Sequence, residues 1–138
     1  MAVKVLLNQN VTVNGSTLTT AVKSAALAVE AAALDSTAMG DSWVENTMGL
    51  KSGTLTLSLL DDFTDDAIDE LVWSWFNTGT AVAWTTRPEA ASIVSVSNPQ
   101  YSGSLLPNQY NIGGGVGELA MKSLTFPLTG AVTRATST

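Results

Sequence analysis

Several short stretches of the chain alternate apolar and polar residues, which is the period of a half-buried β-strand. One of them leads into Asn14-Gly15, a pair that favours a two-residue hairpin turn with both residues at positive φ. The returning strand, residues 16–20, would then pair Leu18 with Val11 on one face. The same alternation predicts further strands at residues 3–7, 55–59, 82–84 and 94–96.

One segment instead repeats its apolar residues every three to four positions, as an amphipathic helix does. Its apolar stripe begins near Ile68 and continues to Phe76, and Gly79 is suited to end it. We therefore predict a helix at about residues 64–77 with Thr64 as its N-cap. Acidic side chains near its start would interact favourably with the helix dipole and face water. The predicted cap and acidic face comprise Thr64, Asp65, Asp66, Asp69 and Glu70.

Residues 22–34 are rich in alanine and admit two interpretations. Local propensity favours a helix, because alanine is the strongest helix former. However, the larger side chains Leu27 and Val29 lie two residues apart, and strands flank the segment on both sides. We favour a strand on these grounds, with the helix as the open alternative.

Two long segments carry turn residues and neither period, so we predict loops at about residues 35–49 and 98–117. Loops of this length are uncommon in compact domains unless they are functional. The first loop carries several large apolar side chains, so it is either functional or folded back on its own core. Its candidate functional residues are Asp35, Met39, Asp41, Trp43, Val44 and Met48.

The last predicted strand spans about residues 118–128. Its apolar phase changes between Met121 and Leu124, which implies a bulge or a crossing from one sheet to another. Residues 134–138 are expected to fray. Together these elements predict one mainly β domain over residues 1–138, with a two-sheet antiparallel β-sandwich or barrel-like core flanked by the helix.

Composition narrows the possible functions. Charged residues make up 13% of the 138 residues, about half the usual share, which suits a protein that works inside an assembly. Twelve acidic residues outweigh six basic ones to give a net charge of −6, and no basic cluster occurs, so a sequence-specific DNA-binding protein is not expected. The chain has neither His nor Cys, and we expect no enzymatic activity.

No motif indicates a catalytic, cofactor or metal site. The acidic residues between Asp61 and Glu70 lack the spacing of a calcium-binding loop. Residues 113–117 are glycine-rich, but no Lys-Ser/Thr pair follows them as in a phosphate-binding loop. No apolar run is long enough to span a membrane, and the first residues do not form a signal peptide, so we expect a protein made in the cytoplasm.

Three short motifs carry a resemblance to a known family. Residues 34–37 read Leu-Asp-Ser-Thr, residues 40–41 read Gly-Asp, and residues 49–50 read Gly-Leu at the start of the strand that precedes the acidic helix. This organisation resembles the major tail tube proteins of siphophages. The resemblance implies that six subunits form a ring and that rings stack into the hollow tail tube of a virion. It also implies that the loop from Asp35 to Met48 reaches an adjacent subunit or ring, which makes its six candidate residues a hypothetical interface. Its partners would be further copies of itself and other tail proteins, and DNA would pass through an acidic lumen without binding.

Other readings remain open. A related injection particle would use the same architecture as a phage tail. A non-catalytic binding module, such as a carbohydrate-binding or capsid-decorating β-sandwich, would stay monomeric or trimeric with an exposed aromatic patch. Head-to-tail contacts that produce rings or filaments distinguish a tube protein from these modules.

Overall fold

The computed structural model describes residues 9–18, 21–63, 67–90 and 92–137. Its seven strands form one antiparallel sheet in the order β2-β1-β5-β6-β7-β4-β3. The strands are β1 (Asn10–Val13), β2 (Ser16–Thr17), β3 (Val22–Asp35), β4 (Asn46–Leu60), β5 (Val82–Arg87), β6 (Gln100–Leu105) and β7 (Met121–Ala135). The described residues contain one helix, α1 (Ile68–Thr78).

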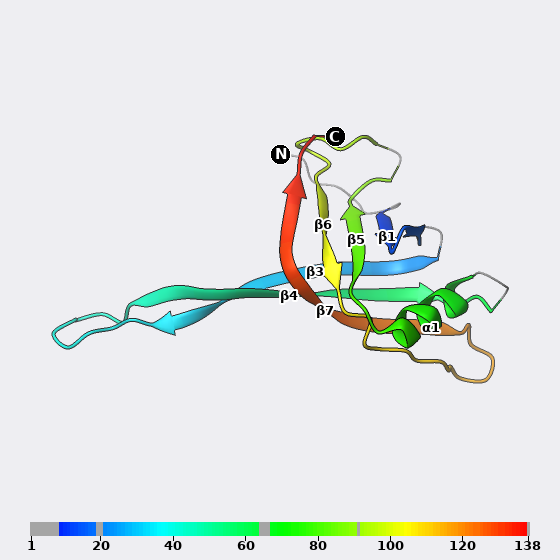
Figure 1. The fold of residues 1–138 in the computed structure, drawn as a ribbon, viewed down its shortest axis with the longest axis horizontal. Coiled ribbons are helices and arrows are strands. Elements are labelled where there is room, and N and C mark those ends of the chain that lie inside the picture. Colours follow the sequence, from blue (N-terminus) through cyan, green and yellow to red (C-terminus); the bar gives the residue numbers. More distant parts are fainter. Residues whose placement is uncertain (1–8, 19–20, 64–66, 91, 138) are drawn as a thin grey trace.

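Strand β7 belongs to both halves of this sheet. Its residues 121–127 pair with β4, and residues from Leu128 to Ala135 pair with β6. In Figure 1, β3 and β4 lie across the molecule while β5, β6 and the end of β7 rise from them. Gly130 has a φ of 82°, and the β6–β7 register shifts beside it, so a bulge accompanies the change of partner.

Side chains from both halves of the sheet and from α1 form one hydrophobic core. The buried members are Val11, Val13, Leu18, Leu55, Leu57, Leu59, Ile68, Val72, Trp75, Val82, Trp84, Leu105, Leu124 and Phe126. The mainly β fold with one flanking helix is therefore confirmed. Its two packed layers are the halves of a single bent sheet.

The hairpin predicted at Asn14-Gly15 is confirmed. Both residues have positive φ, 52° and 80°, which gives the turn the twist that the flanking strands require. The Leu18 amide donates to the Val11 carbonyl at 2.8 Å, and both side chains are buried.

The alanine-rich segment is also a strand, as favoured. Strand β3 pairs with β4 from Val22, opposite Leu59, to Asp35, opposite Asn46, with two irregularities. This long ladder of backbone hydrogen bonds overrides the helix propensity of the alanines.

The helix begins later than predicted. It starts at Ile68, and Ala67 at the N-cap makes no side-chain capping bond. The predicted cap Thr64 and the first-turn residues Asp65 and Asp66 lie outside the described residues. The predicted end is confirmed, since Gly79 adopts a φ of 72° and its N–H donates to the Trp75 carbonyl.

Two predictions between β5 and β7 are wrong. Residues 94–96 form no strand, because the buried Asn98 amide donates to the carbonyls of Glu89, Ser92 and Ile93 and organises the segment as a compact loop. The loop predicted at 98–117 contains β6. This strand was missed because its sequence is short, polar and glycine-containing, and only Leu105 is fully buried.

Boundaries elsewhere also differ. The loop predicted at 35–49 is shorter, because β3 continues to Asp35 and β4 begins at Asn46. The last strand spans β7 rather than 118–128, so Arg134 and Ala135 belong to a strand instead of a frayed end. A crossing between sheet halves does exist, but it lies near Gly130 rather than between Met121 and Leu124.

Candidate functional site

A two-stranded arm projects from the body of the molecule. Residues 46–53 of β4 pair with β3, whereas β4 pairs with β7 only from Thr54 onward. At a rise of about 3.4 Å per residue, this ribbon extends roughly 25 Å beyond the last three-stranded section. Figure 1 shows the arm reaching away from the other elements, with its connecting loop at the far end.

Short-range hydrogen bonds hold this loop, residues 36–45, in shape. The Thr37 amide donates to Asp35 Oδ1 at 2.8 Å, and the Ala38 amide donates to Asp41 Oδ2 at 2.6 Å. The Glu45 amide donates to the Thr37 hydroxyl at 2.7 Å. Hydrogen bonds from the Thr37 hydroxyl and amide lower the pKa of Asp35 below its usual value, so its negative charge stabilises the loop.

The arm exposes large apolar side chains on both strands and at its tip. Met39 is fully exposed and Trp43 is 84% exposed. The other exposed apolar residues of the arm are Val29, Leu34, Val44, Met48 and Leu50. An isolated two-stranded ribbon is only marginally stable in water, and exposed apolar surface of this kind is typical of interaction sites.

All six residues of the hypothetical interface lie on this arm. Asp35 and Asp41 accept the hydrogen bonds that shape the loop. The other four, Met39, Trp43, Val44 and Met48, are exposed. Three further apolar residues of the arm, Val29, Leu34 and Leu50, were missed because the sequence does not show where β3 and β4 leave the body of the sheet. That these residues form an interface stays a prediction.

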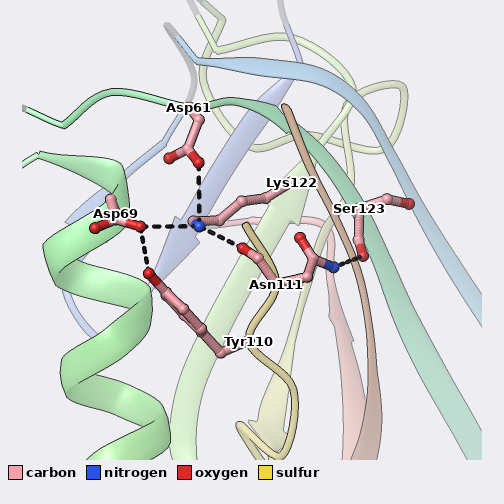
Figure 2. Close-up of polar contacts among 6 residues, drawn as sticks. All are labelled: Asp61, Asp69, Tyr110, Asn111, Lys122 and Ser123. Atoms are coloured by element: carbon pink, nitrogen blue, oxygen red, sulfur yellow. Dashed lines mark hydrogen bonds and ion pairs between the residues drawn. The ribbon is translucent and has the colours of Figure 1, made fainter. Parts of the chain in front are cut away.

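A buried ion cluster holds α1 and the β6–β7 loop against the end of β4. The Lys122 Nζ lies 3.1 Å from Asp61 Oδ2 and 3.0 Å from Asp69 Oδ1, and it donates to the Asn111 carbonyl at 2.5 Å. The Tyr110 hydroxyl donates to the same Asp69 oxygen at 2.6 Å. Figure 2 shows Asp61, Asp69 and the Asn111 carbonyl converging on the Lys122 ammonium, with the Tyr110 hydroxyl directed at Asp69.

Burial and charge pairing both act on the pKa values of this cluster. Burial disfavours the ammonium of Lys122, but hydrogen bonds and charge pairing with Asp69 and Asp61 outweigh that cost and raise its pKa. The hydrogen bond from Tyr110 lowers the pKa of Asp69, and Lys122 adds to this effect against partial burial. The same hydrogen bond raises the pKa of Tyr110. At neutral pH the cluster therefore holds Lys122 charged and Tyr110 protonated.

The predicted acidic face is only partly a solvated face. Glu70 is exposed, but the Asp69 side chain is only 25% exposed and bonds Lys122 and Tyr110. The Asp61 side chain has no exposed surface. A sequence signal for this cluster exists, since Lys122 occupies the same strand phase as the buried Leu124. The cluster was not predicted, because a lysine is not expected at an inward-facing position of a strand.

Trp73 lies off the buried stripe of α1 and is partly covered by the β6–β7 loop. Its ring meets Tyr110 edge-on at 5.1 Å and stacks on Phe76 at 6.0 Å. This arrangement accounts for the aromatic residue on the polar side of the helix.

Within the described ranges, no group of three or more carboxylates is placed to hold a metal ion. Nor does that part of the chain contain a helix long and apolar enough to cross a membrane.

Comparison with known proteins shows likeness in structure rather than in sequence. No protein-family model matches the chain. No curated protein matches it either. The structure is similar to a chain in the virion of a native gene transfer agent particle, with a TM-score of 0.77, 14% identity, and coverage of 96% of this chain and 99% of that chain. It is also similar to a chain in the C6-symmetric tail of an empty gene transfer agent particle, with a TM-score of 0.73, 16% identity, and coverage of 94% and 95%. These likenesses show that the fold is shared with components of virions and tails.

Proposed function

We propose that this chain is a structural subunit of a tail tube, in which six copies close into a ring and rings stack into a hollow conduit for DNA. The protein would be made in the host cytoplasm and reside in the tail of a phage or of a related injection particle. Its partners are other copies of itself and other tail proteins. No catalytic role is proposed for any residue.

The projecting arm carries this proposal. It places Met39, Trp43 and Val44 on exposed surface in the loop that joins β3 and β4. An exposed apolar element that meets a different surface on the next copy makes a head-to-tail contact, and such contacts generate rings or filaments rather than closed dimers. The likeness to a chain of a C6-symmetric tail supports six copies per ring.

The free edge of the sheet supports self-association as well. Strand β3 is terminal in the sheet order, so one of its edges has no neighbouring strand among the described residues. An exposed strand edge offers unpaired N–H and C=O groups to another chain, and this edge carries small alanines that allow close approach. The net charge of −6 suits a conduit that DNA passes without binding.

Substitution of Trp43 with aspartate tests the proposal. A charge at this exposed tip should abolish rings and filaments, because it cannot be buried in an apolar contact without a partner. The unfolding midpoint should stay close to that of the unchanged protein, since Trp43 contacts no core residue of the cluster around Leu55 and Trp84. Sedimentation and light scattering measure assembly, and thermal denaturation measures folding.

The matched control is Val96→Asp, which places the same charge on an apolar residue that is 77% exposed but lies outside the arm. Val96→Asp should assemble like the unchanged protein. Normal assembly of Trp43→Asp, or an equal loss of assembly in both variants, would show that the arm does not form the assembly contact.

A further inference from the structure

An open groove runs along the arm from Met48 to its base, where β3 and β4 meet the β5–β6–β7 part of the sheet. Its volume is about 1090 Å³. Apolar side chains line its floor, among them Leu27, Val29, Leu128 and Val132. Small-ligand sites usually occupy about 300–1,000 Å³, so this groove is large enough for a folded loop.

Basic residues concentrate at this groove. Only six occur in the chain, and Lys51, Arg87 and Arg134 all line it, whereas Lys122 is buried in the ion cluster. Glu30 is the one acidic residue among those lining the groove. The groove therefore has an excess of two positive charges in a protein whose net charge is −6.

Neighbouring groups hold one of these cations in place. Arg87 donates to the carbonyls of Glu89 and Ala90 and to the Gln100 side chain, whereas the exposed Arg134 donates only to the Tyr101 hydroxyl, at 3.2 Å, among the hydrogen bonds of the described residues. Arg87 therefore contributes positive charge to the groove at a small entropic cost on binding.

The tip of the arm has the opposite character. The tip, residues 35–45, contains Asp35, Asp41 and Glu45 and no basic residue, so it carries three negative charges beside Met39, Trp43 and Val44. An apolar centre with an acidic rim thus matches an apolar groove with a cationic rim. The groove runs along the ribbon as far as Met48, and the tip lies beyond it, joined to it by the continuous β3–β4 ladder, so a chain cannot fold its own tip back into its own groove.

We propose that this groove receives the arm tip of a second copy of the chain, with Trp43 and its apolar neighbours on the floor and the acidic residues against Lys51, Arg87 and Arg134. The inference rests on the proposed function, because it requires self-assembly, and adds the receptor surface to it. Each copy has one tip and one groove, so the contact propagates from copy to copy.

Engineered disulfides test this contact, since the chain has no cysteine of its own. Val44→Cys places a thiol at the tip, and Ala131→Cys places one among the groove-lining residues. The protein with both substitutions should assemble under reducing conditions and, after oxidation, give a ladder of covalent multimers on a non-reducing gel. Mixing the two single variants should stop the ladder at dimers, which shows that the bond joins separate chains.

The control pairs Val44→Cys with Asn77→Cys, which lies exposed on α1 outside the groove. This pair should give no ladder. If the assemblies form but the Val44–Ala131 pair fails to cross-link, or cross-links no better than the control, the tip seats elsewhere and the inference is wrong while the proposed function stands. A chain that stays monomeric in every preparation overturns both.

A charge exchange provides an independent measurement. Lys51→Glu and Glu45→Lys should each raise the critical concentration for assembly about tenfold, because each opposes like charges across the contact. The double variant should restore it to near the original value. Failure of the double variant to recover assembly contradicts the pairing. Binding of a DNA duplex that Lys51→Glu abolishes, together with no disulfide ladder, would assign the groove to nucleic acid instead.

Discussion

The Lys122 side chain is completely buried, and its ammonium meets three oxygen acceptors from three different segments. Its Nζ also lies 4.3 Å from the centre of the Tyr110 ring. Asp61 is equally buried, and its Oδ1 has no hydrogen-bond partner among the described residues. Lys122 therefore supplies the positive charge that offsets the cost of burying the Asp61 carboxylate.

Replacing Lys122 with methionine should destabilise the protein by about 3–5 kcal/mol, because it leaves the Asp61 carboxylate buried without a counter-charge. Urea denaturation measures the loss. The double variant Asp61→Asn/Lys122→Met removes both charges and should recover a substantial part of the stability. Additive losses from the two single changes would show that the pair is not coupled.

The same cluster predicts how stability varies with pH. The pKa of Asp69 is lowered from 3.8, so its contribution is complete above that value and is lost as the pH falls through the lower folded pKa. The pKa of Lys122 is raised from 10.5, so its contribution is complete below that value and is lost as the pH rises through the higher folded pKa. Urea midpoints measured from about pH 2 to 6 should fall steeply at the acid end.

Tyr110→Phe is the control for the acid limb, because it deletes the hydrogen bond that contributes most to the lowered pKa of Asp69. In this variant the acid loss of stability should be smaller. Identical pH profiles for the two proteins would contradict the assigned cause.

At the scale of elements, the arm leaves the body at a crowded position. A Cβ on Gly53 would lie 2.8 Å from the Ala28 carbonyl oxygen, and 2.9 Å from both Leu128 Cδ1 and Val29 Cγ1. Glycine at this position lets β7 cross close to the point where β4 loses β7, the second of its two neighbouring strands.

Gly53→Ala should therefore destabilise the protein by about 1–3 kcal/mol, since the added methyl group meets backbone as well as side chains. Thermal or urea denaturation measures the change. Gly114→Ala is the matched control, because a Cβ there would lie 3.7 Å from the Leu119 carbonyl oxygen, an ordinary contact. An equal effect at both glycines would show that crowding at Gly53 is not the cause.

Elements were predicted correctly where the strand pairing of the fold agrees with the local pattern of apolar and polar residues. The hairpin at Asn14-Gly15 and the buried stripe of β4 follow from turn chemistry and alternation alone. Strand β6 could not be found in this way, because Gly103 packs against the Trp84 ring and contributes no apolar side chain to the pattern. Residues 94–96 alternate without forming a strand, since the Asn98 side chain donates to the carbonyls of Ser92 and Ile93 and the Asn98 backbone pairs with Ser95, which closes a loop.

At the scale of the whole molecule, the fold leaves its most extended element without cover. Residues 28–54 make up most of β3, the connecting loop and half of β4. None of them belongs to the hydrophobic core. Trp43 and Met48 stand out in the sequence as large apolar residues in a region without a helical or strand period, and the family resemblance made them interface candidates. The sequence could not show that they sit on a projecting ribbon, because the length of that ribbon depends on where β7 ends its pairing with β4.

Negative-stain electron microscopy of the concentrated protein tests the central claim most directly. The account predicts hollow filaments of stacked rings, with six-fold symmetry in cross-section and an open lumen. A monodisperse monomer at every concentration, or a closed oligomer with no open centre, would contradict it.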